Sequence, residues 1–444
     1  MTPRIGLVRE AALEYLEYDS TFMRMLSSVG GAAAARLLWA VGDTTRAFTV
    51  ASRVHRSGGS RGASTAIERA LRRRPAALRA FYESHIQRSI HGREAQPFLH
   101  HAAALLGYRA IIVKSARDRE RGVLILDYSY IFPLFAALFD IEAVASRYQI
   151  VLEPSWRGIC TADVLCYSAF DFPVLVQSIE PRDTAFINGL RTNLATVPTA
   201  ANWWIDHRLI KPIPGVQRDI DIIVVASWSS LKRHWRLFRM LHQLRKRGHR
   251  LRMALVGYRG DKTLTDIRQE AEYFGVADQV ELHENVPLEE VGRLLARSKV
   301  HVLWSRKEGA NRAIIEAMLA DVPVVVRRGL SYGFAYPYIN PQTGSFAEEH
   351  ELGDVVLDMI ENRGRYRPRE WIMQHMSCQR ATTVLEDAVR EIAVQRSEPW
   401  TTGLTVKTSR LETQGYWNPE DRMRFEADYA FVTAQIRPLP HATG

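Results

Sequence analysis

The sequence predicts an α/β protein with two doubly wound units and a helical segment before them. From about residue 110 onward, short apolar runs typical of buried strands alternate with stretches of helical periodicity. The 444 residues are 46% hydrophobic and 24% charged, a balance typical of globular proteins with roughly two or three domains. The longest apolar stretch, Gly30–Val41, is short and contains Arg36, so no membrane-spanning helix is expected.

The first hundred residues are predicted to be mostly helical, without a strong strand, and Ser57–Ser64 has the composition of a loop or linker. Between Arg53 and Arg93 there are ten arginines and only two acidic residues, Glu68 and Glu83. This segment suits an anionic membrane surface, although a solvated basic helix beside a linker would have the same composition. No nucleic acid is expected as a partner, because the chain has none of the usual binding motifs.

The first α/β block begins near residue 109. A helical stretch is expected at 131–145, and Thr196–Pro214, which contains three prolines, is expected to end the block with a hinge near 212–219. Four apolar runs are interpreted as strands, the third of them weaker than the others: 122–128, 148–152, 163–166 and 174–177.

The second block alternates more regularly, and glycines follow two of its helical stretches. Its five expected strands with helices between them are typical of a Rossmann-like doubly wound sheet: 219–226, 251–256, 279–283, 300–304 and 322–326. The predicted domains are therefore a helical extension, an acceptor domain, a donor domain and a tail that could pack back on the acceptor domain: 1–105, 106–213, 214–395 and 396–444.

Ligands of an open α/β sheet bind beyond the carboxyl ends of its strands, so ligand-binding residues are expected in the loops that follow the strands. The loop Ser227–Trp235 follows the first strand of the second block and offers three serines, Lys232 and Arg233 at the start of a helix. Hydroxyls, backbone N–H groups and cations in this position suit a phosphate or diphosphate. A serine cap beside solvated basic residues is the alternative.

The second loop follows the strand 300–304. Glu308 lies in this loop, Gly309 allows a close approach of the backbone to a ligand, and Glu316 lies in the helix that follows. The N–H groups of Ala310 and Asn311 open that helix and suit an anion, whereas the carboxylates suit hydroxyl groups. A ligand with sugar hydroxyls and a diphosphate would satisfy both the carboxylates and the N–H groups. The alternative is that Glu308 only complements the helix dipole and Glu316 only lies on the helix surface.

These two loops together resemble a known family. The spacing Glu308-x7-Glu316 in EGANRAIIEAM, the following PVVV strand and the entry segment ANWWIDHRLIKP resemble the C-terminal domain of retaining GT-B glycosyltransferases of the family-4 type. The domain is called glycosyl transferases group 1, and the resemblance covers about residues 196–350. It implies a GT-B fold, with two Rossmann-like domains facing a cleft.

The resemblance also implies roles for these residues. Glu308 would contact the donor sugar and support the transition state, Glu316 would hold the ribose, and Lys232 would neutralise the departing diphosphate. Backbone groups of Gly309–Asn311 would help to hold the donor. Family members generally need no bound metal or cofactor. The pair Asp219 and Asp221, the one Asp-x-Asp of the chain, lies at the start of a strand rather than at its carboxyl end.

The sequence departs from the family at several positions. Ser227 stands where the family often has an arginine, so that Arg233 or Arg306 would have to replace it, and Asp321 stands where a glycine is usual. The first block lacks a recognisable glycine-rich acceptor loop. Asp127, at the end of a predicted strand, is the acceptor-side candidate, and four histidines are further candidates only because they lie early in the chain: His85, His91, His100 and His101.

The expected function is the transfer of a sugar from a nucleotide diphosphate sugar to an acceptor hydroxyl, with retained configuration. Only three cysteines are present, which fits the cytoplasm, and the basic character suggests the inner face of a membrane. A saccharide or lipid-linked acceptor in bacterial surface polysaccharide synthesis follows by analogy. The alternatives are a GT-B sugar-nucleotide epimerase or hydrolase, and a non-catalytic partner subunit of a polysaccharide assembly complex.

Overall fold

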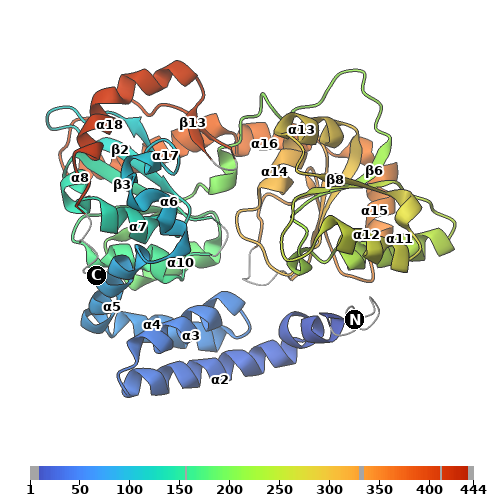
Figure 1. Cartoon of the computed structure of the whole chain (residues 1–444), viewed down its shortest axis with the longest axis horizontal. Coiled ribbons are helices and arrows are strands. Elements are labelled where there is room, and N and C mark those ends of the chain that lie inside the picture. Colours follow the sequence, from blue (N-terminus) through green and yellow to red (C-terminus); the bar gives the residue numbers. More distant parts are fainter. Residues whose placement is uncertain (1–9, 156–157, 330–334, 411–412, 439–444) are drawn as a thin grey trace. The chain divides into compact units, whose positions relative to one another are not determined.

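The computed structural model describes residues 10–155, 158–329, 335–410 and 413–438. Its contacts divide the chain into two compact units, each assembled from separate stretches of sequence (Figure 1). The first unit combines Met1–Arg24 with His207–Ser377, and the second unit combines Met25–Asp206 with Cys378–Gly444. These units do not coincide with the predicted boundaries at 105, 213 and 395. The reason is that residues up to Arg24 pack with 207–377, and residues from Cys378 on pack with 25–206.

The first unit is built on a six-stranded parallel sheet with the strand order β11-β10-β9-β6-β7-β8. The five predicted strands are confirmed, and a sixth was not predicted from the sequence. The strands are β6 (Ile220–Val225), β7 (Met253–Gly257), β8 (Val280–Glu284), β9 (Ser298–Leu303), β10 (Val324–Arg327) and β11 (Gly344–Ala347).

Helices alternate with these strands, as expected of parallel connections. They are α11 (His234–Lys246), α12 (Leu264–Tyr273), α13 (Leu288–Ala296), α14 (Arg312–Leu319), α15 (Leu352–Glu361) and α16 (Pro368–His375). The sheet is wound outward in both directions from β6 and β9, which lie side by side with Ile222 opposite Val300. This pair marks the topological switch point, where open α/β sheets bind their ligands.

The second unit contains a five-stranded sheet in the consecutive order β1 to β5, in which only the pair β1 and β2 is antiparallel. Three of the predicted strands are confirmed. The strands are β1 (Ala110–Lys114), β2 (Gly122–Asp127), β3 (Tyr148–Glu153), β4 (Val174–Gln177) and β5 (Leu194–Val197).

The strand predicted at 163–166 is wrong, because Ala162–Leu165 forms the short helix α9 and Cys166–Ala169 a 3-10 turn. The three apolar residues after Asp163 fit the buried side of a helical turn as well as they fit a strand. The stretch 131–145 contains two helices, α7 (Ile131–Leu138) and α8 (Ile141–Arg147). They are separated at Asp140, whose side chain caps α8 by accepting a hydrogen bond from the Ala143 N–H at 3.2 Å.

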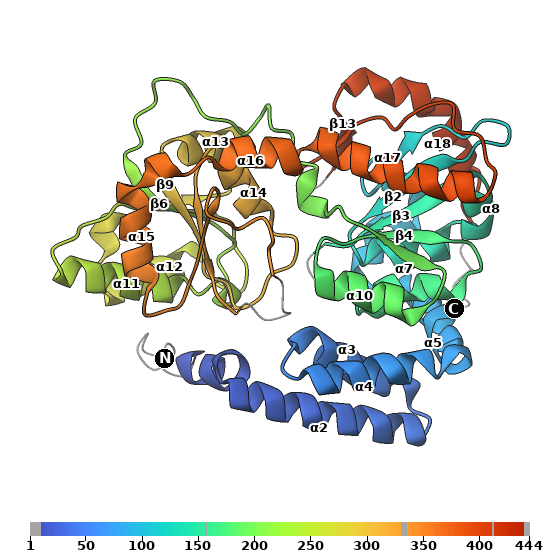
Figure 2. The same ribbon diagram turned by 180° about the vertical axis from the view of Figure 1, so that it is seen from behind.

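The predicted helical character of the first hundred residues is confirmed. Its main helices are α2 (Thr21–Ala40), α3 (Thr44–Ser57), α4 (Arg61–Arg72) and α5 (Pro75–Ser89). The predicted linker is a tight break between α3 and α4, where Gly58 ends α3 in the left-handed conformation and Ser60 caps α4. Figure 2 shows α2 running alongside α3 and α4.

The C-terminal residues form α17 (Cys378–Gln395), a small hairpin of β12 (Lys407–Ser409) and β13 (Gln414–Tyr416), and α18 (Glu426–Thr433). Two tyrosines of this tail contact the edge strand β1. Tyr416 donates a hydrogen bond to the Ile112 carbonyl at 2.6 Å, and Tyr429 accepts one from the Ile112 N–H at 3.1 Å. The tail therefore satisfies backbone groups of an edge strand in its own unit.

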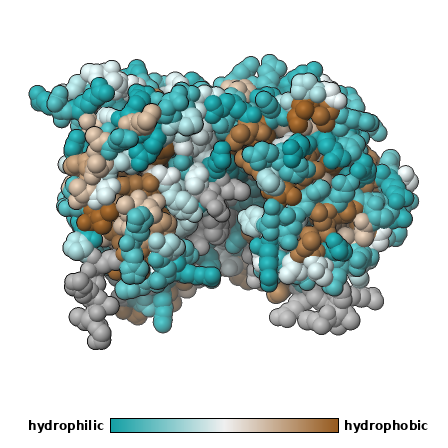
Figure 3. Space-filling model, turned by 45° about the horizontal axis from the view of Figure 1, so that its top comes forward, coloured by the Kyte–Doolittle hydropathy of each residue, from teal (hydrophilic) through white to brown (hydrophobic). Residues whose placement is uncertain are grey.

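Among the described helices, none is long and apolar enough to cross a membrane. On the face shown in Figure 3, hydrophobic residues lie in small groups among hydrophilic ones.

Candidate functional site

Two predicted loops meet at the carboxyl ends of β6 and β9. The Arg306 N–H, just after β9, donates a hydrogen bond to the Leu231 carbonyl, after β6, at 2.9 Å. Because β6 and β9 are adjacent and parallel, both loops leave the sheet at the same edge. The site that the sequence predicted from two separate stretches is therefore one continuous surface.

The central feature of this surface is an ion pair between Lys232 and Glu308, which are 76 residues apart in sequence. Lys232 ends a 3-10 turn, and Glu308 is only 9% exposed. The ammonium group donates directly to the carboxylate. The structure thus brings together the two residues that the family resemblance makes catalytic.

The serines of the first loop have structural partners. The Ser230 hydroxyl donates to an Asp261 carboxylate oxygen at 2.6 Å, and the Ser229 hydroxyl accepts from the Leu231 N–H at 3.2 Å. Burial opposes the charge of Asp261, but the hydrogen bonds from Ser230 and Ser229 hold the pKa of this carboxyl group below its usual value. Ser227, two residues beyond β6, is half-buried. Ser229 and Ser230 thus order the loop around Lys232.

The second loop leads into α14 through a capped start. Asn311 accepts a hydrogen bond from the Ile314 N–H at 3.0 Å, and its own N–H donates to the Gly309 carbonyl at 2.8 Å. Gly309 is buried, whereas Ala310 is partly exposed. Glu316 is 6% exposed and lies 3.5 Å from Arg312 on the same helix. The loop is therefore held by its own hydrogen bonds before a ligand binds.

An unpredicted feature lies beside this pair, where acidic residues from the start of the chain bind arginines of both loops. Arg233, with a left-handed φ of 57° and no exposed surface, lies 3.1 Å from both Glu14 and Asp19. Arg306 lies 2.7 Å from Glu14 and 3.2 Å from Glu10. Both arginines that could replace the missing family arginine thus have carboxylate partners within the chain.

More cations belong to the same network. Arg236 lies 2.9 Å from Glu14 and 3.1 Å from Asp19, and Arg327 lies 2.6 Å from Asp19. Burial opposes the charge of Asp19, but the nearby Arg233 and Arg327 outweigh it and lower the pKa of this carboxyl group. We call these residues the arginine cluster: Arg233, Arg236, Arg306 and Arg327. This cluster could not be predicted from the sequence, because Glu14 and Asp19 lie more than 200 residues before the arginines that they contact.

Two histidines beneath the site are kept neutral. His234 opens α11 and His301 lies in β9, and both are buried. Burial, together with the charge of Lys232, lowers the pKa of each imidazole to about 3, and Lys262 contributes to the shift at His234. At neutral pH they are therefore uncharged core residues rather than proton donors.

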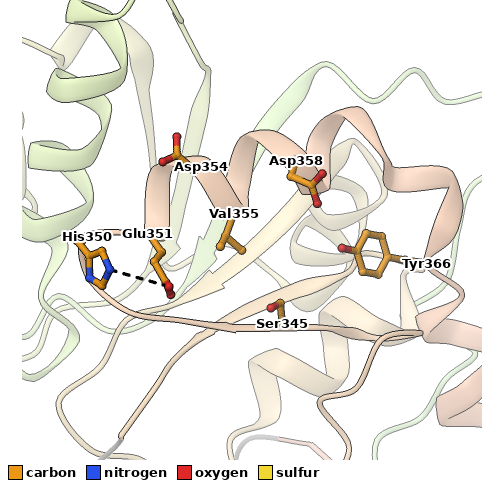
Figure 4. A pocket seen from close by; sticks show the side chains of 7 residues that line it. All are labelled: Ser345, His350, Glu351, Asp354, Val355, Asp358 and Tyr366. Carbon is orange, nitrogen blue, oxygen red and sulfur yellow. Dashed lines mark ion pairs between the residues drawn. The ribbon is translucent and has the colours of Figure 1, made fainter.

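One pocket of the first unit lies away from these loops. It has a volume of about 450 Å³ and is lined by residues of β11, α15 and the segments around them, as Figure 4 shows. Three of its lining residues are carboxylates, Glu351, Asp354 and Asp358. Because a nucleoside diphosphate is an anion, this pocket does not suit it.

On the acceptor side, Asp127 lies at the carboxyl end of β2, as predicted, but is only 4% exposed. It lies 3.2 Å from Arg109 and accepts a hydrogen bond from Gln414 at 2.6 Å. Its carboxylate is therefore held inside the unit, and the acceptor contact remains a prediction.

Among the predicted histidines, His85 lines a pocket of about 200 Å³ near the carboxyl ends of β2 and β3. Its Nε2 lies 2.9 Å from Asp163, and the hydroxyl-bearing residues Ser129, Tyr130 and Ser155 line the same pocket. The other three histidines are exposed and lie outside this lining: His91, His100 and His101.

No group of three or more potential metal ligands is found in the described part of the chain. The Asp-x-Asp pair is engaged in ion pairs at the start of β6. Asp219 lies 2.6 Å from Arg297, and Asp221 lies 2.6 Å from Lys299.

The sequence model of the family described as Glycosyl transferases group 1 matches residues 208–372, which include both loops and α14. This part of the chain is a glycosyl transferases group 1 domain. The predicted family is thus confirmed over this range, and the α/β class with two mainly parallel sheets is confirmed as well. Among the curated proteins, no significant relative is found.

Several solved structures are similar to the chain. Sucrose-phosphate synthase from Thermosynechococcus elongatus is 14% identical over 61% of this chain and 73% of its own, with a TM-score of 0.47. TarM is 17% identical over 60% of this chain and 53% of its own, also with a TM-score of 0.47. Anabaena HepE in complex with UDP is 17% identical over 61% of this chain and 79% of its own, with a TM-score of 0.46.

Proposed function

We propose that the chain is a retaining glycosyltransferase that moves a sugar from a nucleotide diphosphate sugar to an acceptor hydroxyl. The observation that carries this proposal is the Lys232–Glu308 pair at the switch point between β6 and β9, inside the range of the family match. A cation and a carboxylate at this edge complement a diphosphate and a polyol, which are the two halves of a sugar donor.

In the proposed reaction, the bond between the sugar carbon and the phosphate oxygen breaks, and a bond to the acceptor oxygen forms. The acceptor proton moves to the leaving phosphate oxygen. Lys232 exchanges Glu308 for the departing diphosphate, while Glu308 turns to the sugar hydroxyls and Glu316 binds the ribose. The N–H groups that open α14 add positive potential at the same place. Charge stabilisation by these groups takes the place of a metal ion or cofactor.

The acceptor is proposed to be a saccharide or a lipid-linked saccharide, as in bacterial surface polysaccharide synthesis at the inner face of the membrane. The pocket around His85 supports an acceptor hydroxyl, because it offers an imidazole and several hydroxyls at the carboxyl edge of its sheet. The basic segment Arg53–Arg93 supports contact with an anionic membrane surface from the cytoplasm.

The proposal is tested by measuring the melting temperature with a panel of nucleotide diphosphate sugars. A donor that binds the native state raises the melting temperature by mass action. One donor is expected to do so in the native protein, and Lys232→Ala and Glu316→Ala are expected to weaken its effect. Lys246→Ala, which changes an exposed lysine of α11, is the matched control and should respond like the native protein.

The donor found in this way is then used to measure sugar transfer and release. Release of the nucleotide only with an acceptor supports the transferase, whereas acceptor-independent turnover points to an epimerase or hydrolase. A folded protein that responds to no donor contradicts the proposal and favours a non-catalytic partner.

A further inference from the structure

Helix α2 packs on its neighbours with only one face. Ala32, Ala35 and Trp39 are buried, and a Cβ added to Gly31 would lie 2.5 Å from a methyl group of Val54 on α3. The backbones of α2 and α3 are therefore closely packed at this point, and the other face of α2 is not needed for the core.

That other face is apolar and exposed. Ten of the sixteen large hydrophobic residues that are exposed in the described part of the chain lie between Leu13 and Val41. Phe22, Leu26 and Leu37 are exposed by 65%, 55% and 70%. We call the exposed residues on this side of the helix, which recur every three or four positions, the α2 stripe: Phe22, Leu26, Val29, Ala33 and Leu37. A single helix seldom exposes so much apolar surface without a partner.

The charge around the stripe indicates what the partner is. Residues 21–93 contain 13 arginines, no lysine and three acidic residues, a net charge of +10 that equals the formal net charge of the entire chain. Helix α2 contains no acidic residue at all. A second copy of the chain would bring equal positive charge against this surface, and a nucleic acid would leave the apolar stripe uncovered. An anionic lipid surface matches both features.

We propose that the α2 stripe inserts into the interface of an anionic membrane, with the arginines of 21–93 binding lipid headgroups. This proposal deepens the proposed membrane association and names the element that makes the contact. It does not depend on glycosyl transfer, so it can be tested without a donor or an acceptor.

The test is flotation of the full chain with vesicles of phosphatidylcholine alone and of phosphatidylcholine mixed with phosphatidylglycerol. The protein is expected to bind the anionic vesicles. The double variant Leu26→Ser with Leu37→Ser is expected to bind them about tenfold more weakly or worse, because it removes two leucine side chains that would insert into the membrane interface. The double variant Val394→Ser with Met423→Ser, which changes exposed apolar residues elsewhere, is the matched control.

Binding that stays unchanged in the α2 variant overturns the proposal, since the arginines would then act alone. Equal binding to both kinds of vesicle, or to neither, overturns it as well. Light scattering in solution gives an independent check, because a native dimer that the α2 variant converts to a monomer would assign the stripe to a second copy.

A separate observation concerns the arginine cluster. Glu14 has no exposed surface and lies 2.7–3.1 Å from Arg233, Arg236 and Arg306. Arg233 follows Lys232 directly, and Arg306 precedes Glu308 by two residues. Guanidinium groups bind carboxylates and phosphates in the same way, through paired N–H donors. The N-terminal carboxylates thus occupy cations beside the proposed diphosphate site.

We infer that Glu14 and Asp19 compete with the donor diphosphate for the arginine cluster, so that tight donor binding releases residues 10–19 from it. This inference rests on the proposed donor site. The affinity for the donor would then depend on whether residues 10–19 are bound to the arginine cluster. Lys232 and Glu308 alone would not create this dependence.

The first test is calorimetric titration with UDP and with inorganic diphosphate. The double variant Glu14→Gln with Asp19→Asn is expected to bind both about tenfold more tightly, which corresponds to about 1.4 kcal/mol. Glu83→Gln with Asp171→Asn, which neutralises two exposed partners of Arg79, is the control and should not change either affinity.

A second measurement covers the case in which the variant is unstable. In the native protein, saturating UDP should increase amide hydrogen exchange in residues 10–19. The competition is overturned if the double variant binds both ligands with unchanged affinity and UDP leaves the amide exchange of residues 10–19 unchanged. The contacts of Glu14 and Asp19 would then have a purely structural role. Tighter binding of diphosphate by the double variant but no binding of UDP would support the competition and contradict a uridine nucleotide as the donor.

Discussion

At the scale of single residues, two neighbours in sequence have different ion-pair partners. Lys232 contacts Glu308, whereas the adjacent Arg233 turns into the interior toward Glu14 and Asp19. The left-handed backbone at Arg233 produces this divergence. Its φ of 57° lies in a region that residues other than glycine seldom adopt. Buried charges are stable only when paired, so each of the two cations needs its own carboxylate.

The buried histidines give a pH prediction. His234 and His301 have a pKa of about 3 in the folded chain, against the usual value near 6.5 when unfolded. Below pH 6.5 these two histidines bind protons in the unfolded chain but stay neutral in the folded chain. Their contribution to the free energy of unfolding, which is complete above pH 6.5, is therefore lost as the pH falls toward 3. At pH 5.5 the loss is about 1.4 kcal/mol for each histidine.

The measurement is the midpoint of denaturant unfolding between pH 7.5 and 5.5. His301→Gln is expected to flatten this dependence whatever its effect on stability at pH 7.5. His91→Gln, which changes an exposed histidine, should leave the dependence as it is in the native protein. A His301→Gln profile parallel to the native one would contradict the prediction.

At the scale of elements, close strand packing fixes where the loop that contains Lys232 leaves the sheet. A Cβ added to Gly257, at the end of β7, would lie 2.0 Å from the Ala226 carbonyl oxygen just beyond β6. Only glycine permits this approach, which fixes the end of β6 from which the Lys232 loop departs. Gly344 in β11 is similarly close to the Val324 carbonyl oxygen, at 2.1 Å.

Replacing Gly257 therefore tests how the close packing of β7 on the end of β6 supports the loop that contains Lys232. Gly257→Ala is expected to destabilise the protein by more than about 2 kcal/mol, since the backbone of β7 must move away from β6. Gly189→Ala, at a helical position with open space around its Cβ, should leave stability unchanged or slightly higher. Thermal unfolding measures both changes, and equal melting temperatures for the two variants would contradict the prediction.

At the scale of the whole molecule, each unit is completed by a segment distant in sequence. Residues up to Arg24 belong with 207–377, and those from Cys378 on belong with 25–206. The family match, at 208–372, lies within the first of these units. The donor and the acceptor are consequently expected to affect different units.

Hydrogen exchange across the full chain tests this expectation. The nucleoside diphosphate of the donor found by the melting-temperature panel should protect amides of residues 226–235 and 304–316 and leave the strands between residues 110 and 197 unchanged. The Lys232→Ala variant supplies the control, because it should lose most of the protection at the same nucleotide concentration. Protection spread equally over both sheets would contradict a donor site confined to the first unit.

The sequence alone determined the local elements and the identity of the candidate residues. The strands of the second block were predictable because parallel strands are buried on both faces and have continuous apolar runs, as in 222–226 and 322–326. The two loops were predictable because the ends of such strands are known from the runs themselves. The short run 163–166 failed, since four residues do not distinguish a strand from a helical turn.

Only the tertiary structure decided which distant residues meet. The pairing of β6 with β9 brings Lys232 to Glu308, and the packing of the first residues brings Glu14 to the arginine cluster. Neither contact leaves a periodic signal, because an ion pair needs only two side chains and no pattern between them. The exposed α2 stripe was likewise hidden, since its residues resemble those of the buried face until packing on α3 selects one side.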